Sequence, residues 1–453
     1  MIPRSVLFLT VKPFGAGRFR KPDLLMPAQL DYEVTYVQPL RRVFADVSTY
    51  DFWTDYVVRG PAKANRGLVE CVKSTLPSYV VWPARMYEVF ESTLLGLADA
   101  GAIVVGWFFD DDLRFHDYTA GWLPYLDYCM THQKGALQAY RAAGARAFHL
   151  IPGANADVYM PLKLDLRYDV TFAGRHMPHR VTWLAEFARG GISAQAFGRG
   201  FPSGFLSTPD LVRLFNESRI NLCLSRSYRD GGGVQLKARV FEICMSGGFC
   251  LCEWTPDLEE YFDVGREIEA FRTVSEAVEK ARFYLDDEAC RTAIAHAGLE
   301  RAQRCYREDL LLGRVFNAIE EDRRSPHCHR RRSVVPGASI HSAPNAASWH
   351  AGVSRGLLMN AAPRDRWLEE ARLALEYAPR NAEALRLLRL RALPHRIATP
   401  ALQLSELLDQ LRGALARGKH LVRECGAFAR HRRSSRDRRD PSGPPNESKG
   451  AAR

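Results

Sequence analysis

Charged and polar side chains recur at helical spacing near the middle of the chain. Intervals of four, three and four residues separate Gln235, Arg239, Glu242 and Ser246. An α-helix would place residues at this spacing on one face. A carboxylate and a guanidinium on one helix face could hold the ribose hydroxyls and the diphosphate of a nucleotide-sugar. The alternative is an ordinary ion pair between Arg239 and Glu242 on a solvated face.

Three consecutive carboxylates, Asp110, Asp111 and Asp112, directly follow the apolar run AIVVGWFF. At the carboxyl end of a parallel strand they would lie where ligands of α/β proteins bind, and one could act as a general base. An apolar strand that ends in Asp-x-Asp is also similar to the metal-binding motif of GT-A glycosyltransferases, which fits Asp110 and Asp112. A loop whose first aspartate caps the next turn is the structural alternative. His116 and His132 are further candidates for proton transfer.

Three short glycine-containing segments could bring backbone N–H groups to a phosphate. Gly174-Arg175 follows the β-type run DVTFA, and Gly198-Arg199-Gly200 follows another such run in the same way. The run Gly231–Gly233 permits positive φ angles and close backbone approach, so it could form a phosphate-binding nest. A plain turn or an unoccupied loop is the alternative for each segment, and for Gly198-Arg199-Gly200 we favour the turn.

The segment from Ile220 to Glu260 would position the first group of residues. An apolar β-type run, INLCLS, precedes a polar loop that ends in three glycines, and a helix-forming stretch begins at Val234. Gly247-Gly248 ends this helix, and the buried β-type run FCLC follows. Such a strand–loop–helix–strand unit opens its loop onto a helix N-terminus, where unpaired N–H groups and the helix dipole favour anions.

Longer stretches resemble one known family. Two segments resemble the C-terminal half of the CgeB/YkvP-like spore-protein glycosyltransferases: LKARVFEICMSGGFCLCEWTPDLEEYFDVGREIEAF and AVEKARFYLDDEACRTAIAHAGLERAQRCY. This family is a group within the two-domain GT-B glycosyltransferases (glycosyl transferases group 1). The strands of the family's nucleotide domain look like YDVTFAGRHMPHR and LFNESRINLCLS. The end of its N-terminal domain resembles VVGWFFDDDLRF and THQKGALQAYRAAGARAFHLIPGANADVYMP, so the resemblance covers residues 80–320.

This resemblance implies roles for the donor-side residues. Glu242 matches the glutamate that accepts hydrogen bonds from the ribose hydroxyls. Arg239, with Lys237 as second choice, would face the charge of the diphosphate. Gly174-Arg175 matches the turn at which GT-B enzymes bring backbone and a basic side chain to the diphosphate. Many GT-B enzymes have a second acidic residue eight positions before the ribose glutamate; Val234 stands there, so recognition of the sugar would use other groups.

The resemblance also implies the substrates. The donor would be a nucleotide-diphosphate sugar, with uridine diphosphate (UDP) as the expected carrier, and neither a cofactor nor a metal ion is expected. In a GT-B arrangement Asp110, Asp111, Asp112 and His116 would face the acceptor, and one of them would activate its hydroxyl. The GT-A interpretation is disfavoured because the Asp-x-Asp motif lies about 130 residues before the nucleotide-like helix.

Composition limits the class of protein. With 453 residues the chain is long enough for two or three domains, and a hydrophobic content of 46% is that of a globular protein. The net charge is +11, but the excess of Lys and Arg lies from Arg323 onward, while residues 1–322 are slightly acidic. Nucleic acid is therefore not an expected partner of the main body.

Cysteine usage and hydropathy indicate a compartment. Ten cysteines occur without a Cys-x-x-Cys pair, which predicts reduced thiols rather than a zinc site. The apolar run Val6–Val11 is too short for a signal peptide, and no stretch has the length of a membrane span. We expect a cytoplasmic protein, with peripheral contact to a membrane as an option.

Two successive blocks alternate short β-type runs with helical patterns. The runs of the first block are Val6–Thr10, Val34–Val37, Tyr79–Trp82, Ile103–Phe109 and Ala147–Ile151. Those of the second block are Asp169–Ala173, Ile192–Phe197, Ile220–Ser225, Phe249–Cys252 and Glu267–Phe271. The alternation predicts an α/β protein, GT-B-like, with two Rossmann-like parallel-sheet domains that face a cleft.

The domain boundaries follow from these blocks. We predict an N-terminal acceptor domain at 1–155 and a nucleotide-sugar-binding domain at 156–323. A basic tail at 324–453 would be partly disordered, with low hydrophobicity in HCHRRRSVVPGASIHSAPNAAS. Residues 364–393 resemble one tetratricopeptide-like helix–turn–helix, which could contact a protein partner but cannot bury its apolar face alone.

Together these features predict a metal-independent glycosyltransferase that moves a sugar from a nucleotide-diphosphate donor to a cell-surface, polysaccharide or protein acceptor. The alternative is a non-catalytic GT-B-like binding or scaffold protein that acts through its basic tail. Val234, where an acid is expected, favours this alternative. The sequence leaves open the sugar, the acceptor, the stereochemistry and the oligomeric state.

Overall fold

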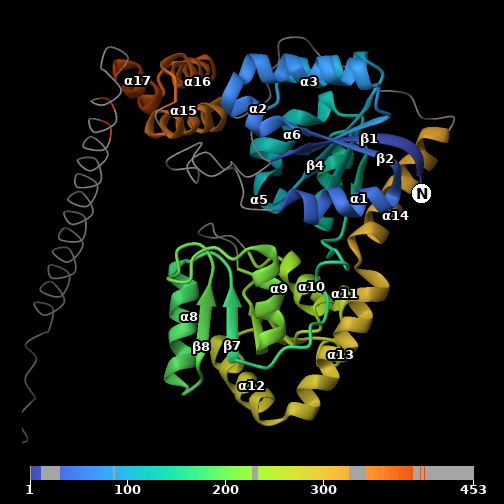
Figure 1. The fold of residues 1–453 in the computed structure, drawn as a ribbon, viewed down its shortest axis with the longest axis vertical. Coiled ribbons are helices and arrows are strands. Elements are labelled where there is room, and N and C mark those ends of the chain that lie inside the picture. Colours follow the sequence, from blue (N-terminus) through green and yellow to red (C-terminus); the bar gives the residue numbers. More distant parts are fainter. Residues whose placement is uncertain are drawn as a thin grey trace, which may run out of the picture. The chain divides into compact units, whose positions relative to one another are not determined.

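The computed structural model describes residues 2–11, 31–84, 87–226, 233–325, 343–360 and 362–390, together with Ala398 and Leu402. The chain up to Leu385 forms one compact unit, and the residues from Arg386 onward form a second. Two parallel sheets, each with its own helices, make up most of the first unit (Figure 1). This confirms the predicted pair of Rossmann-like domains.

Six parallel strands form the sheet of the first domain, in the order β2-β1-β3-β4-β5-β6. Their bounds are β1 Ile2–Thr10, β2 Phe44–Asp51, β3 Tyr79–Ala84, β4 Ile103–Phe108, β5 Tyr128–Thr131 and β6 Ala147–His149. Strands β3 and β4 are buried along their whole length, as expected of central strands with helices on both faces. The carboxyl ends of all six strands lie at the same edge of the sheet.

The helices of the first domain connect these strands. Their bounds are α1 Gln38–Val43, α2 Phe52–Arg59, α3 Pro61–Thr75, α4 Glu91–Asp99, α5 Asp111–Arg114, α6 Ala120–Trp122 and α7 Leu137–Ala142. The strand predicted at 34–37 is wrong, because this segment is a π-helical turn that leads into α1. Tyr36, Leu40 and Val43 recur at helical spacing and are buried. The second strand is instead the polar edge strand β2.

Five parallel strands form the sheet of the second domain, in the order β11-β10-β9-β7-β8. Their bounds are β7 Tyr168–Ala173, β8 Ala194–Phe197, β9 Ser218–Cys223, β10 Cys250–Glu253 and β11 Glu269–Phe271. The helices are α8 Pro178–Arg189, α9 Thr208–Glu217, α10 Ala238–Met245, α11 Leu258–Tyr261, α12 Val274–Asp286 and α13 Glu288–Cys305. All five predicted β-type runs of this block are strands.

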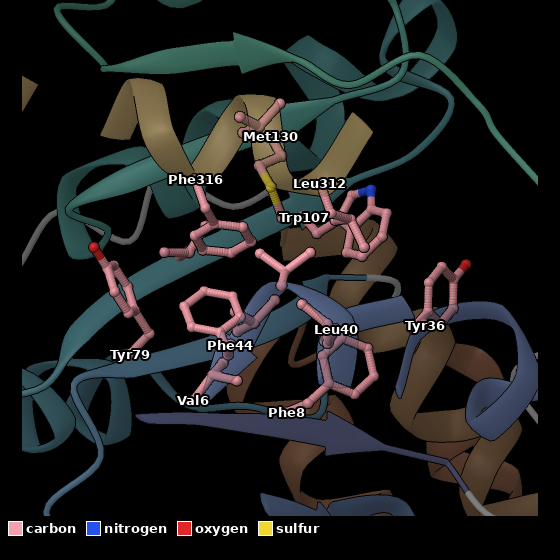
Figure 2. Close-up of a cluster of buried hydrophobic side chains, with 14 of the residues drawn as sticks. Val6, Phe8, Tyr36, Leu40, Phe44, Tyr79, Trp107, Met130, Leu312 and Phe316 are labelled. Atoms are coloured by element: carbon pink, nitrogen blue, oxygen red, sulfur yellow. The ribbon is translucent and has the colours of Figure 1, made fainter. Parts of the chain in front are cut away.

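The next helix, α14 (Glu308–Arg324), returns to the first domain and completes its core. Phe316 packs edge-on against Phe44, with ring centroids 4.7 Å apart, and Leu312 lies in the same cluster (Figure 2). The Tyr79 hydroxyl donates a hydrogen bond of 2.5 Å to Glu320. The division at 155 and 323 stays a prediction, but the side chains of α14 serve the first domain.

Two further helices, α15 (Ala343–Met359) and α16 (Arg364–Tyr377), pack against each other and against α2 (Figure 1). The Trp349 ring lies 5.9 Å from that of Tyr56, and Arg366 donates a hydrogen bond of 3.1 Å to the Tyr56 carbonyl. The predicted disorder at 343–348 is therefore wrong, since these residues begin α15. The predicted helical segment at 364–393 contains α16 and α17 (Ala382–Arg389); residues 326–342 and most of those beyond 390 lie outside the described chain.

The described residues also bear on the cysteines and on membrane contact. The eight cysteines among them are free thiols, five of them buried. No helix in the described part of the chain has the length and apolar character needed to cross a bilayer.

Candidate functional site

The carboxylates that follow β4 lie in a strained turn at the carboxyl edge of the first sheet. Asp110 has a φ of 59° and a ψ of 35°, a left-handed conformation that is uncommon for a residue other than glycine. Within the described chain, Leu76 is the one other such residue. Strain of this kind persists where the surroundings hold it in place, and it is concentrated at functional sites.

Asp111 has a structural position. Its carboxylate is buried and accepts hydrogen bonds from Thr119 (2.6 Å), Thr131 (2.5 Å) and Tyr140 (2.8 Å). Burial raises the pKa of Asp111, and the three hydroxyl groups oppose that rise. The carboxylate joins the turn after β4 to β5 and α7. Because this carboxylate is buried and accepts three hydroxyl donors of the protein, it does not suit the predicted role of a base.

Asp110 and Asp112 meet a side chain of the second domain. The Gln235 amide donates to Asp112 Oδ1 at 2.9 Å and lies 3.4 Å from Asp110 Oδ1. Lys237 donates in turn to the Gln235 carbonyl oxygen. Partial burial and the neighbouring Asp110 charge raise the pKa of Asp112, and the Lys237 ammonium opposes this. The structure therefore joins two predicted groups that stand more than 120 residues apart in the chain.

Helix α10 begins later than its sequence pattern predicts. Its N-cap is Lys237, in extended conformation, and the Gln235 N–H donates to the Ser225 carbonyl at 3.0 Å. Gln235 thus belongs to the strand-like return of the loop and not to the helix face with Arg239. Ser246 caps the other end, where its buried hydroxyl donates to the Glu242 carbonyl at 2.8 Å. The predicted four-residue face is therefore wrong at Gln235, which lies before the helix.

Arg239 and Glu242 form the central pair of that face. Their side chains lie 2.7 Å apart and are 29% and 16% exposed. The Arg239 guanidinium also lies over the Phe215 ring, 5.5 Å from its centroid. Burial, then the Glu242 charge, raises the pKa of Tyr159, which belongs to the segment that joins the domains. A partly exposed carboxyl group that has accepting capacity left over is suited to binding a diol.

The end of β7 is a turn with close backbone contacts. Gly174 N–H donates to the Phe197 carbonyl at 2.8 Å, and His176 N–H donates to the Arg199 carbonyl at 2.9 Å. A Cβ at Gly198, where φ is +120°, would lie 2.3 Å from the Gly174 oxygen. The glycines after β8 therefore allow two strand ends to approach, which accounts for Gly198-Arg199-Gly200 as a turn. The Arg175 side chain is exposed beside this turn.

Arg180, in the first turn of α8, is a residue that the sequence analysis missed. Its guanidinium donates to the Arg175 carbonyl at 3.0 Å and lies over the Phe172 ring. Burial lowers the pKa of Arg180, and burial also lowers that of Lys237, with Arg180 contributing to the latter effect. Two half-buried cations that repel each other form a site that an anion would stabilise. The signal was a second arginine five residues after Arg175.

The histidines and the glycine loop complete the predicted group. His116 is exposed on the π-helical turn after α5, with its ring edge-on to Phe115. His132 accepts a hydrogen bond of 2.8 Å from the Trp107 indole and stacks on that ring, which is a structural role. Gly231 and Gly232 lie outside the described residues, and Gly233 is exposed.

A cavity in the described chain lies elsewhere. It has a volume of about 520 Å³ and is lined by residues that precede the strands of the first sheet, among them Pro77, Asp127 and Arg146. It is therefore at the edge opposite Asp110. No group of three or more His, Cys, Asp or Glu side chains among the described residues is placed to hold a metal ion.

Comparisons with known proteins bear on the second domain. Residues 175–308 match the model of a family described as glycosyl transferase-like, and this segment contains Arg175, Arg180, Lys237, Arg239 and Glu242. It makes up less than a third of the chain. No match was found among the curated proteins.

Solved structures that resemble the chain are distant. The chain is similar to Anabaena HepE in complex with UDP-glucose, at 12% identity over 70% of this chain and 100% of that one, with a TM-score of 0.46. A glycosyltransferase from Rickettsia africae matches at 10% identity over 71% and 99% of the chains, with a TM-score of 0.45. The lipopolysaccharide outer core galactosyltransferase WaaB matches at 13% identity over 70% and 99%, with a TM-score of 0.42.

Proposed function

We propose that this chain is a GT-B-type glycosyltransferase of the CgeB-like group. It would transfer a sugar from a UDP-linked donor to a hydroxyl group of a glycan, polysaccharide or protein. The observation that carries the proposal is the contact between Gln235 and the two carboxylates Asp110 and Asp112. That contact brings acidic groups of one parallel sheet to the cationic group of a glycosyl transferase-like segment.

The donor would bind to the second domain. Glu242 accepts hydrogen bonds from the two ribose hydroxyls once Arg239 turns toward the diphosphate. Arg180 and Lys237 neutralise the diphosphate together with the N-terminus of α10, whose first N–H groups have no partner within the helix. These groups would stabilise the departing diphosphate without a metal ion or a cofactor.

The chemical step is a displacement at the anomeric carbon. A bond forms between the acceptor oxygen and the anomeric carbon, and the bond from that carbon to the phosphate oxygen breaks. The bonding electron pair leaves with UDP, and the acceptor proton passes to Asp112. Asp112 suits this task because it is exposed and its pKa is raised, which makes it a stronger base than an ordinary aspartate. Asp110 holds Gln235 in place.

One observation supports a second candidate function. Val234 stands where an acid is expected, and it pairs with Arg226 across the base of the loop, so it leaves no carboxylate for the sugar. A scaffold protein would bind UDP without turning over any UDP-sugar. An enzyme must release UDP from its donor, so an assay for UDP release separates the two candidates.

Replacing Glu242 by Ala is expected to weaken the binding of both UDP and uridine by about 10–100-fold, because charged hydrogen bonds to the ribose are lost. Isothermal calorimetry on the folded variant measures both affinities. Glu300→Ala is the matched control, since it removes a 65% exposed glutamate from α13. Unchanged binding in Glu242→Ala would remove the ribose assignment.

Replacing Arg180 by Gln is expected to separate UDP from uridine. The variant should lose about 10–100-fold in UDP affinity, because a guanidinium–phosphate interaction is removed, and should bind uridine as the unchanged protein does. Arg189→Gln, on the same helix with an exposed side chain, serves as the control. Equal losses for UDP and uridine would show that Arg180 supports the fold and does not contact the phosphates.

A further inference from the structure

The chain passes between the two domains twice, and the two passages lie side by side. Ala154 N–H donates to the Tyr306 carbonyl, and Glu308 N–H donates to the Ala154 carbonyl, both at 3.0 Å. These bonds form an isolated parallel bridge between Ala154 and Arg307. Any change in the relative positions of the domains must act on this short crossover.

A carboxyl group is buried in the crossover. Glu308 is 4% exposed, and its Oε2 accepts a hydrogen bond of 3.0 Å from Gly153 N–H. A Cβ at Gly153 would lie 2.6 Å from this oxygen, so the carboxyl group rests directly against the backbone of the other passage. Within the described chain no salt bridge involves Glu308.

Two acidic charges act on Glu308. Burial, followed by the charges of Asp309 and Glu242, raises the pKa of Glu308 to about 8, against the lowering effect of the Gly153 N–H. Asp309 is itself paired with Arg307 at 2.8 Å and lies 3.8 Å from Arg42. At pH 7, below this pKa, the neutral form of Glu308 is favoured.

The same segment connects this carboxyl group with the proposed ribose site. Gly153 contacts Glu308, and Tyr159, six residues later, interacts with Glu242. Asn155, between them, donates to the Val34 carbonyl at 2.8 Å and so fixes the segment to the first domain. Glu242 and Glu308 are therefore linked in two ways, through this segment of the chain and through the electrostatic effect of Glu242 on Glu308.

We propose that Glu308 is a positioning residue whose neutral carboxyl group holds the interdomain crossover in the state that binds the nucleotide. This inference rests on the proposed function, since Glu242 acts on the ribose. Ionised, the buried carboxylate would be repelled by the charges of Asp309 and Glu242, and movement of the crossover toward water would relieve it. The nucleotide-binding state would lose population as a result.

Linkage fixes the direction of the effect. Bound UDP adds negative charge and removes water near Glu242, and both changes favour the neutral form of Glu308. Binding and protonation then favour each other reciprocally. Because the pKa of Glu308 without ligand is about 8, UDP affinity should be constant below that value and should fall as the pH rises through it.

The test is calorimetric titration with UDP at about pH 7 and about pH 9. The unchanged protein should bind about tenfold more weakly at the higher pH, because about nine-tenths of Glu308 is ionised there. Glu308→Gln, which keeps an acceptor for Gly153 N–H and cannot ionise, should bind equally well at both. Titration of UDP itself affects both proteins alike.

Two further variants complete the experiment. Glu300→Gln, at an exposed position on α13, should keep the pH dependence of the unchanged protein. Asp309→Asn removes a charge that raises the pKa of Glu308, so the midpoint of the affinity loss should move to lower pH. This variant also tests the proposal if Glu308→Gln does not fold.

A pH dependence in Glu308→Gln identical to that of the unchanged protein, or an unmoved midpoint in Asp309→Asn, overturns the role of Glu308. Absence of UDP binding at both pH values in the unchanged protein overturns the proposed function and this inference with it.

Discussion

Asp112→Asn is expected to lower turnover by about 10²–10⁴-fold, the loss that follows removal of a general base, and to leave UDP affinity nearly unchanged. The carboxylate lies on the first domain and contacts the second through the neutral amide of Gln235, so the diphosphate site keeps its cations. The rate is measured as UDP release from a UDP-sugar that supports turnover, with a panel of glycan and peptide acceptors. Calorimetry gives the UDP affinity.

In the unchanged protein the rate should fall with decreasing pH, because the base must be ionised to act. The midpoint of this fall should lie above the pKa of an ordinary aspartate, because the pKa of Asp112 is raised.

The neighbouring aspartate provides a matched control. Asp111→Asn makes the same chemical change one residue away, but that carboxylate accepts three hydroxyl donors in the interior. We expect about 1–3 kcal/mol of lost stability and an unchanged rate per folded molecule. A large rate loss in folded Asp111→Asn, together with full activity in Asp112→Asn, would reverse the roles of the two residues.

The same variants address the role of a metal ion. With side chains and the α10 N-terminus neutralising the diphosphate, turnover should persist in excess EDTA. Under the Asp-x-Asp alternative, chelation abolishes activity, and Asp110→Asn and Asp112→Asn lose donor affinity. Manganese-dependent binding that disappears in Asp112→Asn would support that alternative and move the donor to the first domain.

Glu370→Ala is expected to destabilise the protein by about 3–5 kcal/mol, because it leaves buried partners uncompensated. Glu370 is fully buried between His350, at 2.8 Å, and the Tyr56 hydroxyl, at 3.3 Å. Burial, then Glu370, raises the pKa of Tyr56 well above its ordinary value, so this hydroxyl remains a donor. Urea denaturation followed by tryptophan fluorescence measures the loss, since Trp53 and Trp349 lie at the same contact.

A second acidic residue on α16 tests whether the loss of stability depends on the buried position of Glu370 or only on the loss of a negative charge. Glu376 is exposed, and Glu376→Ala should change stability by less than about 0.5 kcal/mol. The charge pattern and composition predict that truncation after Pro326 leaves a soluble protein with intact donor binding. The truncation should instead destabilise the protein as Glu370→Ala does, because it uncovers Tyr56 and Trp53. A truncated protein as stable as the full chain would show that α15 and α16 contribute nothing to the first domain.

The sequence predicted most of the strands but missed two, the edge strand β2 and the interior strand β5 of the first sheet. The runs of β3 and β4 have almost no polar side chains, because strands covered on both faces have no polar side. β2 was missed because most of its residues are at least partly exposed, so FADVSTYD has no strong apolar pattern. The segment 34–37 was predicted as a strand from four residues, too few to separate a period of two from a helical period.

Prediction of the site was limited by contacts between distant segments. Lys237, Arg239 and Glu242 stand in one motif and were found together, whereas the bond from Gln235 to Asp112 joins separate domains. Residues 308–323 were assigned to the second domain because they follow it in the chain, and chain order does not say which core a helix completes. The three consecutive aspartates likewise have different roles only because Thr119, Thr131 and Tyr140 surround the middle one.

The return of α14 to the first domain makes the second domain an insertion. Its entry at Ala154 and its exit at Tyr306 are hydrogen-bonded neighbours, the arrangement in which one fold can be placed inside another without stretching the host. The core of the first domain is therefore discontinuous in the sequence, with β1 before the inserted domain and α14 after it. Domains form during synthesis as their residues emerge, so the domain that begins first is completed last. Until residue 319 leaves the ribosome, the cluster around Phe44 and Tyr79 lacks one wall and stays open to any chaperone that binds exposed aromatic side chains.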